Sequence, residues 1–250
     1  MILTPSYKRP AELRRCLGSL KETVSNDNLY DLLIVDDCSP CEMGYGEILE
    51  SHHPYNHPLG NGNNWKVIKT PQNGGFTKCV NYGIRYLWKK DHQYKYMLLL
   101  NNDATLNHGW LQKMTAAFND QMKVGVVAPY LAVWCPDSIY PTPPGSNEQY
   151  PHEKNENPID VRNRMVKELG ISEWFEEHVG FWGVLIRFDL FERFGLFDED
   201  FKVICQDLDF CWRIGREGWK IKVMSEGNNH SIWHVGHTHV DLKPKSEIDP

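Results

Sequence analysis

The sequence predicts an α/β fold in which a mainly parallel central sheet is flanked by helices. Short apolar runs alternate with longer segments that repeat apolar residues at helical spacing through the first half of the chain. The run at residues 32–35 is apolar at every position, as is typical of strands covered on both faces. Alternation of this kind favours right-handed crossovers between parallel strands.

The first half of the chain gives the clearest element pattern. The expected strands cover residues 1–4, 30–36, 65–69, 96–100 and 124–133, and the expected helices cover 11–22, 75–90 and 110–119. In the first of these helices, Leu13, Leu17 and Leu20 recur at helical spacing behind Pro10, which suits the first turn of a helix.

Two stretches interrupt the alternation, and we expect both to be long loops. Residues 38–64 are rich in glycine, asparagine, histidine and proline, and residues 135–158 are too rich in proline for a regular element. Beyond them we expect helices over 159–169 and 207–217, and strands over 184–187, 219–223 and 231–234. No linker is visible, so the sequence predicts one domain over residues 1–250.

The composition excludes several classes of protein. Of the 250 residues, 41% are hydrophobic and 24% are charged, which argues against disorder, and the net charge of −6 gives no attraction to polyanions. No apolar run approaches the roughly 20 residues of a membrane helix. The seven cysteines are odd in number and scattered, and no signal peptide is visible. We therefore expect a protein that is cytoplasmic or peripheral to a membrane.

Polar residues follow two of the expected strands. Asp36 and Asp37 end the second strand, and Asn101, Asn102 and Asp103 follow the fourth. Ligands of open parallel sheets bind at the carboxyl ends of the strands, so the two clusters are expected to converge on one crevice. The alternative interpretation is that these residues only start turns and cap helices.

A second candidate motif is a pair of glycines before a helix. Asn73, Gly74 and Gly75 precede the helix that carries Asn81 and Gly83. Glycines at this position let the backbone approach an anion and present free amide groups to it. A plain turn is the alternative, and the motif lacks the lysine of a phosphate-binding P-loop.

Two carboxylates stand near the start of a later helix. Asp207 and Asp209 follow Gln206, and apolar residues at helical spacing continue behind them. Acidic residues are favoured in a first turn by the helix dipole. The two carboxylates could instead be a general base, held close to the proton that it removes, and its companion.

The remaining candidates are histidines, cysteines and aromatic residues. A zinc site could form from the clustered residues His230, His234, His237 and His239. Cys38 and Cys41 have the spacing of redox motifs, but the lack of a second pair favours a coincidence. Most of the nine tryptophans are expected in the core, whereas Trp182 is the best placed to stack on a sugar ring.

Together these motifs resemble family 2 glycosyltransferases of the GT-A nucleotide-diphospho-sugar transferase fold, in the rhamnosyltransferase-like branch. The resemblance runs from Ile2 to about Thr238. It is carried by residues 2–10, 34–39, 73–83, 99–103, 109–111, 195–199 and 206–218. It implies a nucleotide-sugar-binding half at 1–133, an acceptor-side half at 134–250, and a small second sheet near the acceptor side.

The resemblance also implies roles for individual residues. The implied donor-binding residues are Thr4, Tyr7, Arg9, Asp36, Asp37, Asn73, Gly74, Gly75, Asn81, Asn101, Asn102 and Trp182. Asp103 and His234 are the implied ligands of Mn²⁺ or Mg²⁺, and Asp207 is the implied catalytic base. The sequence departs from the family pattern at Asn101, where an acidic residue is usual, and at Gln206, where glutamate is usual.

The implied function is an inverting, metal-dependent transfer of a hexosyl or deoxyhexosyl group. The donor would be a UDP- or dTDP-sugar, and the acceptor a hydroxyl of a glycan, a lipid-linked glycan, a protein or a small molecule. A nucleic-acid acceptor has no support from the net charge. Two alternatives remain open: a nucleotide-sugar-binding protein without catalysis, and a zinc- or redox-regulated interaction domain.

Overall fold

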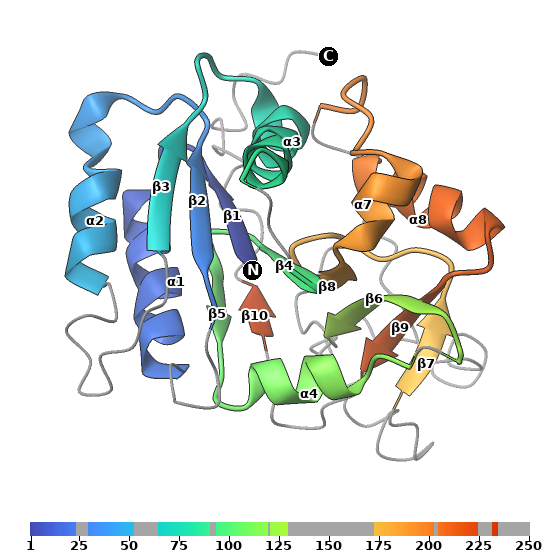
Figure 1. Cartoon of the computed structure of the whole chain (residues 1–250). Helices are drawn as coiled ribbons and strands as arrows, with labels where there is room; N and C mark the ends of the chain where they lie inside the picture. Colours follow the sequence, from blue (N-terminus) through green and yellow to red (C-terminus); the bar gives the residue numbers. More distant parts are fainter. Residues whose placement is uncertain are drawn as a thin grey trace, which may run out of the picture.

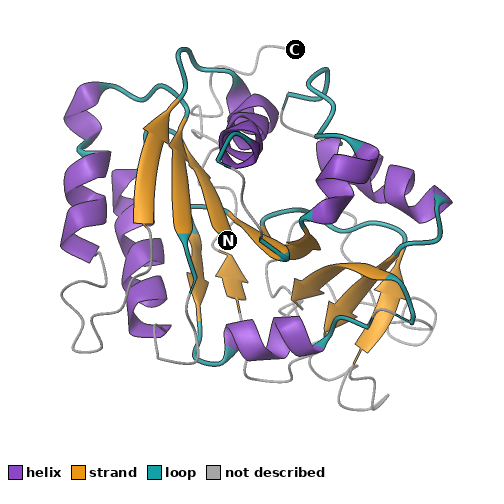
Figure 2. Ribbon diagram, in the orientation of Figure 1, coloured by secondary structure: helices purple, strands orange, loops and turns teal. Residues whose placement is uncertain are grey.

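The centre of the molecule is one sheet with helices on both faces (Figures 1 and 2). The computed structural model of the chain describes residues 1–23, 30–52, 65–90, 94–119, 121–129, 173–202, 205–224 and 232–234. Within these residues the sheet has eight strands in the order β3-β2-β1-β4-β8-β6-β9-β7. They are β1 (Ile2–Ser6), β2 (Leu32–Asp36), β3 (Trp65–Lys69), β4 (Tyr96–Leu100), β6 (Val124–Pro129), β7 (Glu173–Glu176), β8 (Gly183–Arg187) and β9 (Lys220–Met224).

The predicted mainly parallel sheet is confirmed. Strands β3, β2, β1 and β4 are mutually parallel, and β6 pairs in parallel with β9. β8 runs antiparallel to both β4 and β6, and β7 runs antiparallel to β9. β1, β2 and β6 are buried along their whole length, as is typical of strands covered on both faces, and the buried polar residues Ser6 and Asp36 stand at the carboxyl ends of β1 and β2.

Helices cover the two faces of the sheet in separate groups. One apolar cluster joins Ile2 and Leu32 to α1 (Pro10–Thr23), α2 (Tyr45–His52) and α4 (Trp110–Ala116). The other joins Leu3 and Leu33 to α3 (Gly75–Trp88), α7 (Asp189–Phe194) and α8 (Gln206–Arg216). Figure 1 shows α1 and α2 on one side of β1–β3 and α3 on the other.

The expected second sheet is present. Within the described residues it consists of β5 (Ala104–Leu106) and β10 (Ile232–His234), which pair antiparallel. β5 begins directly after Asp103, so this small sheet joins the carboxyl end of β4 to a segment from the end of the chain.

The prediction of a long loop over residues 38–64 is wrong in its first part. A 3-10 helix, η1 (Cys41–Met43), is followed by α2. Tyr45, Ile48 and Leu49 are buried, at the i, i+3, i+4 spacing of one helix face. The surrounding glycines, histidines and prolines obscured this short apolar face.

Several other differences lie at the boundaries of elements. β7 and α7 were not expected, and the strand expected to reach residue 133 is described only to Pro129. The loop expected over 135–158 and the helix expected over 159–169 lie outside the described residues. None of the described helices is long and apolar enough to cross a membrane.

The closest approach of a helix to the sheet gives a test of the packing. A Cβ atom at Gly83 of α3 would lie 2.7 Å from Leu3 and 2.8 Å from Val35, whereas one at Gly18 of α1 would meet nothing within 4 Å. Gly83→Ala is therefore expected to lower the free energy of unfolding by about 1–3 kcal/mol. Gly18→Ala is expected to raise it by roughly 0.5–1 kcal/mol through helix propensity.

Urea denaturation of the two variants measures both effects. Equal stabilisation by the two alanines would contradict the close packing of α3 on β1 and β2.

Candidate active site

The carboxyl ends of four parallel strands meet along one edge of the sheet, as the sequence predicts. Ser6, Asp36 and Lys69 are paired neighbours at the ends of β1, β2 and β3. Ser6 touches both polar clusters: its carbonyl oxygen accepts from Asp37 N at 2.9 Å, and its Oγ accepts from Asn102 Nδ2 at 2.8 Å. The two clusters therefore converge on one edge.

Helix α2 contributes a residue that the sequence analysis missed. Tyr45 Oη accepts hydrogen bonds from Ser6 Oγ and from Arg9 N, both at 3.0 Å. This buried phenol fixes the loop between β1 and α1. The loop carries Tyr7, which is 40% exposed, and the half-buried Arg9 beside the strand ends. The helical spacing of Tyr45, Ile48 and Leu49 was the signal that could have found it.

The carboxylate of Asp37 organises the loop between β3 and α3. Its Oδ1 accepts from Thr70 Oγ1 at 3.1 Å and from Gly74 N at 2.9 Å. Its Oδ2 accepts from Asn73 Nδ2 at 2.9 Å and from Gly75 N at 2.8 Å. Asp37 is only 3% exposed, so these bonds satisfy a carboxylate that burial would otherwise penalise.

These contacts correct one part of the sequence prediction. The amides of Gly74 and Gly75 were expected to be free for an anion, whereas in this structure both donate to Asp37. Asn73 is drawn into the same arrangement. The paired glycines are still required, because Gly75 has a φ of +79° and a Cβ there would lie 3.3 Å from the carbonyl oxygen of Lys202.

Asp36 lies beside this loop and is also engaged. Its Oδ1 accepts from Ser39 N at 2.9 Å, and its Oδ2 lies 3.9 Å from Lys69 Nζ. Lys69 also donates to the carbonyl oxygen of Ser39 at 2.6 Å. The ammonium group offsets the charge of a carboxylate that is 6% exposed.

Thr4 is the most buried of the predicted donor-binding residues on β1. It is fully buried, and its Oγ1 has no hydrogen-bond partner among the described residues. On β1 it alternates with Leu3, which faces α3, and so lies on the sheet face that α1 covers.

Asn81 occupies a different place from that expected of a donor-binding residue. It is fully buried in α3, where Nδ2 donates to the carbonyl oxygen of Phe197 at 2.8 Å and to Glu199 Oε1 at 3.1 Å. Its Oδ1 accepts from Phe197 N at 3.1 Å. The amide therefore binds the segment before α8, and its assignment to the donor stays a prediction.

The candidate metal ligands lie at the carboxyl end of β4. Asp103 is 5% exposed and close to Cys16 of α1: burial, and then the charge of Asp103, raise the pKa of the Cys16 thiol to about 12. His234 pairs with Ala104, so its backbone lies opposite the neighbour of Asp103. No group of three or more His, Cys, Asp or Glu suited to a metal exists in the described part of the chain.

Asn101 and Trp182 meet at the same end of β4. Asn101 N donates to the carbonyl oxygen of Trp182 at 3.1 Å. The register of β4 and β8, with Leu100 opposite Gly183, brings this tryptophan to the edge that carries the polar clusters. Three of the four clustered histidines, His230, His237 and His239, lie outside the described residues.

The start of α8 separates the roles of its two carboxylates. Asp209 Oδ2 accepts from Arg213 Nε at 2.9 Å and lies 2.8 Å from Nη2 of the same guanidinium, with which it forms an ion pair. The same guanidinium donates to the carbonyl oxygen of Leu196 at 2.8 Å. Asp207 is half-buried and accepts only from Leu208 N at 2.9 Å, with no ion pair among the described residues. Gln206 is 5% exposed, and its Oε1 has no partner within that part of the chain.

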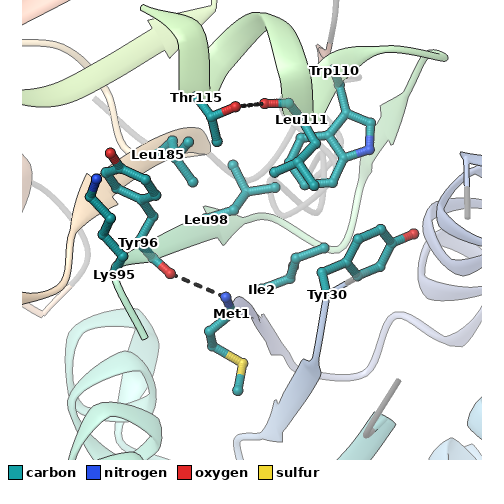
Figure 3. Close-up of a pocket in the computed structure, with 10 residues that line it drawn as sticks. All are labelled: Met1, Ile2, Tyr30, Lys95, Tyr96, Leu98, Trp110, Leu111, Thr115 and Leu185. Carbon is teal, nitrogen blue, oxygen red and sulfur yellow. Dashed lines mark hydrogen bonds between the residues drawn. The ribbon is translucent and has the colours of Figure 1, made fainter. Parts of the chain in front are cut away.

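The cavity shown in Figure 3 belongs to another region of the molecule. It has a volume of about 200 Å³ and lies between α4 and the amino ends of β1 and β4. Its walls include Ile2, Leu98, Trp110 and Leu185. Because ligands of such sheets bind at the carboxyl ends, this cavity at the amino ends is not the candidate active site.

Comparison with known proteins identifies the family. Residues 1–177 match the model described as glycosyl transferase family 2. No curated protein matches the chain.

Solved structures share the fold at low sequence identity. TarS of S. aureus has a TM-score of 0.57 and 18% identity, over 93% of this chain and 36% of TarS. GalNAc-T7 with UDP, GalNAc and Mn²⁺ has a TM-score of 0.65 and 14% identity, over 93% of this chain and 43% of that one. The mannosyltransferase PcManGT from Pyrobaculum calidifontis, in complex with GDP-Man and Mn²⁺, has a TM-score of 0.57 and 14% identity, over 91% of this chain and 57% of that one.

The chain thus spans less than two thirds of the length of each of these relatives. The likeness confirms the GT-A fold, and the rhamnosyltransferase-like branch stays a prediction.

The role of Asp37 in the loop can be tested through stability. Asp37→Ala leaves the half-buried amides of Gly74 and Gly75 without their acceptor and removes one acceptor of Thr70, so it is expected to lower the free energy of unfolding by about 1–3 kcal/mol. Asp198→Ala removes an exposed carboxylate that accepts only a turn amide, and is expected to change it by less than about 0.5 kcal/mol. Similar urea midpoints for the two variants would show that Asp37 does not hold the loop.

Proposed function

The chain belongs to glycosyltransferase family 2, and from this premise we propose that it is an inverting glycosyltransferase. It moves a hexosyl or deoxyhexosyl group from a UDP- or dTDP-sugar to an acceptor hydroxyl, with Asp207 as general base and Mn²⁺ or Mg²⁺ as cofactor. The observation that carries this proposal is the contrast on α8, where Asp209 is held by Arg213 while Asp207 has no ion pair within the described part of the chain.

The base must be a carboxylate that is able to accept a proton from the acceptor hydroxyl. An ion pair with a guanidinium disfavours protonation, so Asp209 is poorly suited to this step. Asp207 lacks such a partner in the described residues and lies in the first turn of α8, after the segment that α3 holds. It would take the proton as the oxygen attacks the sugar.

The donor nucleotide would lie along the carboxyl ends of β1 and β2. Asp36 is proposed to accept the imide N–H of uracil or thymine. Asp37, whose two oxygens already accept from the loop before α3, would instead hold the border of the pocket. Tyr7, Arg9, Asn101, Asn102 and Trp182 would complete the pocket, and the loop of Asn73, Gly74 and Gly75 would border it. One structural neighbour is named with UDP and another with GDP-Man, so the comparisons do not identify the nucleobase of the donor.

The metal assignment rests on the chemistry of Asp103 and His234. A carboxylate from Asp103 and an imidazole from His234 suit Mn²⁺ or Mg²⁺ when diphosphate oxygens supply further ligands. Such a metal, when bound, would neutralise charge that develops on the leaving diphosphate. Two protein ligands are few, so the ion is expected to bind poorly without nucleotide.

The contrast between the two carboxylates of α8 supports an inverting mechanism. A single displacement needs one base opposite the leaving group, whereas a double displacement needs a second, nucleophilic carboxylate close by. Asp209 is the nearest carboxylate to Asp207 along α8, and its contacts with Arg213 are part of the packing of α8 on α7. The proposal also includes an acceptor hydroxyl on a glycan, a lipid-linked glycan, a protein or a small molecule. It further includes one catalytic domain over residues 1–250 and a cytoplasmic or membrane-peripheral location.

Replacing the proposed base gives the sharpest test of this mechanism. Asp207→Asn keeps the size of the side chain but removes its ability to take a proton, and is expected to lower kcat by roughly 10²- to 10⁴-fold. The dissociation constant of the donor and the melting temperature are expected to stay near those of the wild type. Initial rates, calorimetry and thermal melts measure the three quantities.

Asp209→Asn is the matched control two residues away. It removes the ion pair with Arg213, so it is expected to lower the melting temperature while retaining most of kcat. Near-normal turnover of Asp207→Asn would remove this residue as the base. Donor binding without any transfer by the wild type would instead favour a binding protein without catalysis.

Nucleotide calorimetry tests the donor and the metal together. With Mn²⁺ present, UDP and dTDP are expected to bind more tightly than GDP and ADP, and EDTA is expected to weaken binding. Asp103→Asn keeps the shape of the side chain but lacks its charge, so it is expected to lose the gain from Mn²⁺. Tightest binding by GDP would overturn the assignment of a uracil or thymine nucleotide as donor. Equal binding in EDTA would overturn the metal assignment.

A further inference from the structure

One face of α3 carries a row of polar side chains that all bind the same segment. Thr77, Asn81 and Arg85 are four residues apart, so they lie in line along the helix. Each contacts residues 197–202, the segment that leads to Gln206 and Asp207. We name this row the α3 polar row.

Thr77 is the member of the row that is nearest to the active site. It is fully buried, and its Oγ1 donates to the carbonyl oxygens of Phe201 and of Lys202, the latter at 3.2 Å. Its own N–H donates to Lys202 O at 3.3 Å. Backbone groups of residues 201 and 202 are therefore fixed to the first turn of α3.

The other two members hold the beginning of the segment. Asn81 forms a two-way pair with the backbone of Phe197, and it also donates to Glu199. Arg85 Nη2 lies 2.8 Å from Glu199 Oε1. The hydrogen bond from Asn81, followed by that from Arg85, holds the pKa of Glu199 below its usual value, so Glu199 stays ionised at neutral pH.

The same turn of α3 also continues from the loop between β3 and α3, residues 70–74, which borders the proposed donor pocket and is called the donor loop here. Gly75 donates to Asp37, and a Cβ there would lie 3.3 Å from Lys202 O. Thr77 is two residues further along the chain. The donor loop and the segment before the base therefore meet at the first turn of α3.

We infer that Thr77 is a positioning residue, which sets the place of Asp207 relative to the donor loop through its bonds to Phe201 and Lys202. The inference rests on the proposed function, because Asp207 has a position to be set only if it is the base. A displacement of about 1 Å between a base and its proton can cost up to 10²-fold in rate, so a small shift of this segment is expected to affect kcat.

Three variants of the chain test the inference. Thr77→Val removes the hydroxyl at nearly constant volume, and is expected to lower kcat by about 10- to 100-fold without changing donor affinity. Thr77→Ser retains the hydroxyl and is expected to restore most of kcat. Thr23→Val is the matched control, because Thr23 is also buried and donates to the carbonyl oxygen of Leu20 at 2.9 Å, in α1; its kcat is expected to be unchanged.

A double-mutant cycle separates positioning from general destabilisation. In the Asp207→Asn background no base remains to be placed, so adding Thr77→Val is expected to cause little further loss of kcat. A similar loss in both backgrounds, or an unchanged kcat for Thr77→Val, would overturn the inference while leaving the proposed function intact. A wild type that binds donor but transfers no sugar would overturn the proposed function and the inference with it.

Discussion

The hydrogen bonds of the buried Asp37 carboxylate are the interactions on which the candidate active site at the edge of the sheet depends. It accepts bonds from Thr70, Asn73, Gly74 and Gly75, and so ties the end of β2 to the start of α3. Since one residue satisfies several donors from a single loop, the path of that loop is determined by the end of β2. The carbonyl oxygen of Ser6 accepts a hydrogen bond from Asp37 N, so the end of β1 is held in the same arrangement.

Helix α3 connects the two sides of the candidate active site. Its first turn includes Gly75, which binds Asp37, and its polar row binds the segment before α8. Transfer with inversion requires the base and the leaving group on opposite sides of one carbon atom, so their separation must be constant. A single helix in contact with both sides is a simple way to keep that separation.

Much of the fold could be predicted from the sequence because its elements have clear periodicity. The polar clusters that follow the second and fourth expected strands were predicted to converge, and in the structure both contact Ser6. Helix α2 was missed because its apolar face is short and lies among loop-forming residues. Strand β7 and helix α7 are too short, at four and six residues, to show a period.

The candidate site was predicted less completely, for a physical reason. Asn73, Gly74 and Asn81 are polar or small residues in or just before a helix that follows a parallel strand, and such residues bind either a ligand or the protein itself. Sequence alone does not distinguish these uses, since the partners of Asn81 are more than a hundred positions away. The contrast between Asp207 and Asp209 likewise depends on Arg213 and its further bonds to the segment before α8.

The stereochemistry of a single transfer tests the central claim most directly. The wild type is incubated with Mn²⁺, a panel of UDP- and dTDP-sugars and a set of hydroxyl acceptors, and the first product formed is followed by proton NMR. One base and one displacement predict that the anomeric configuration of the product is opposite to that of the donor. A product that retains the configuration of the donor would contradict this mechanism.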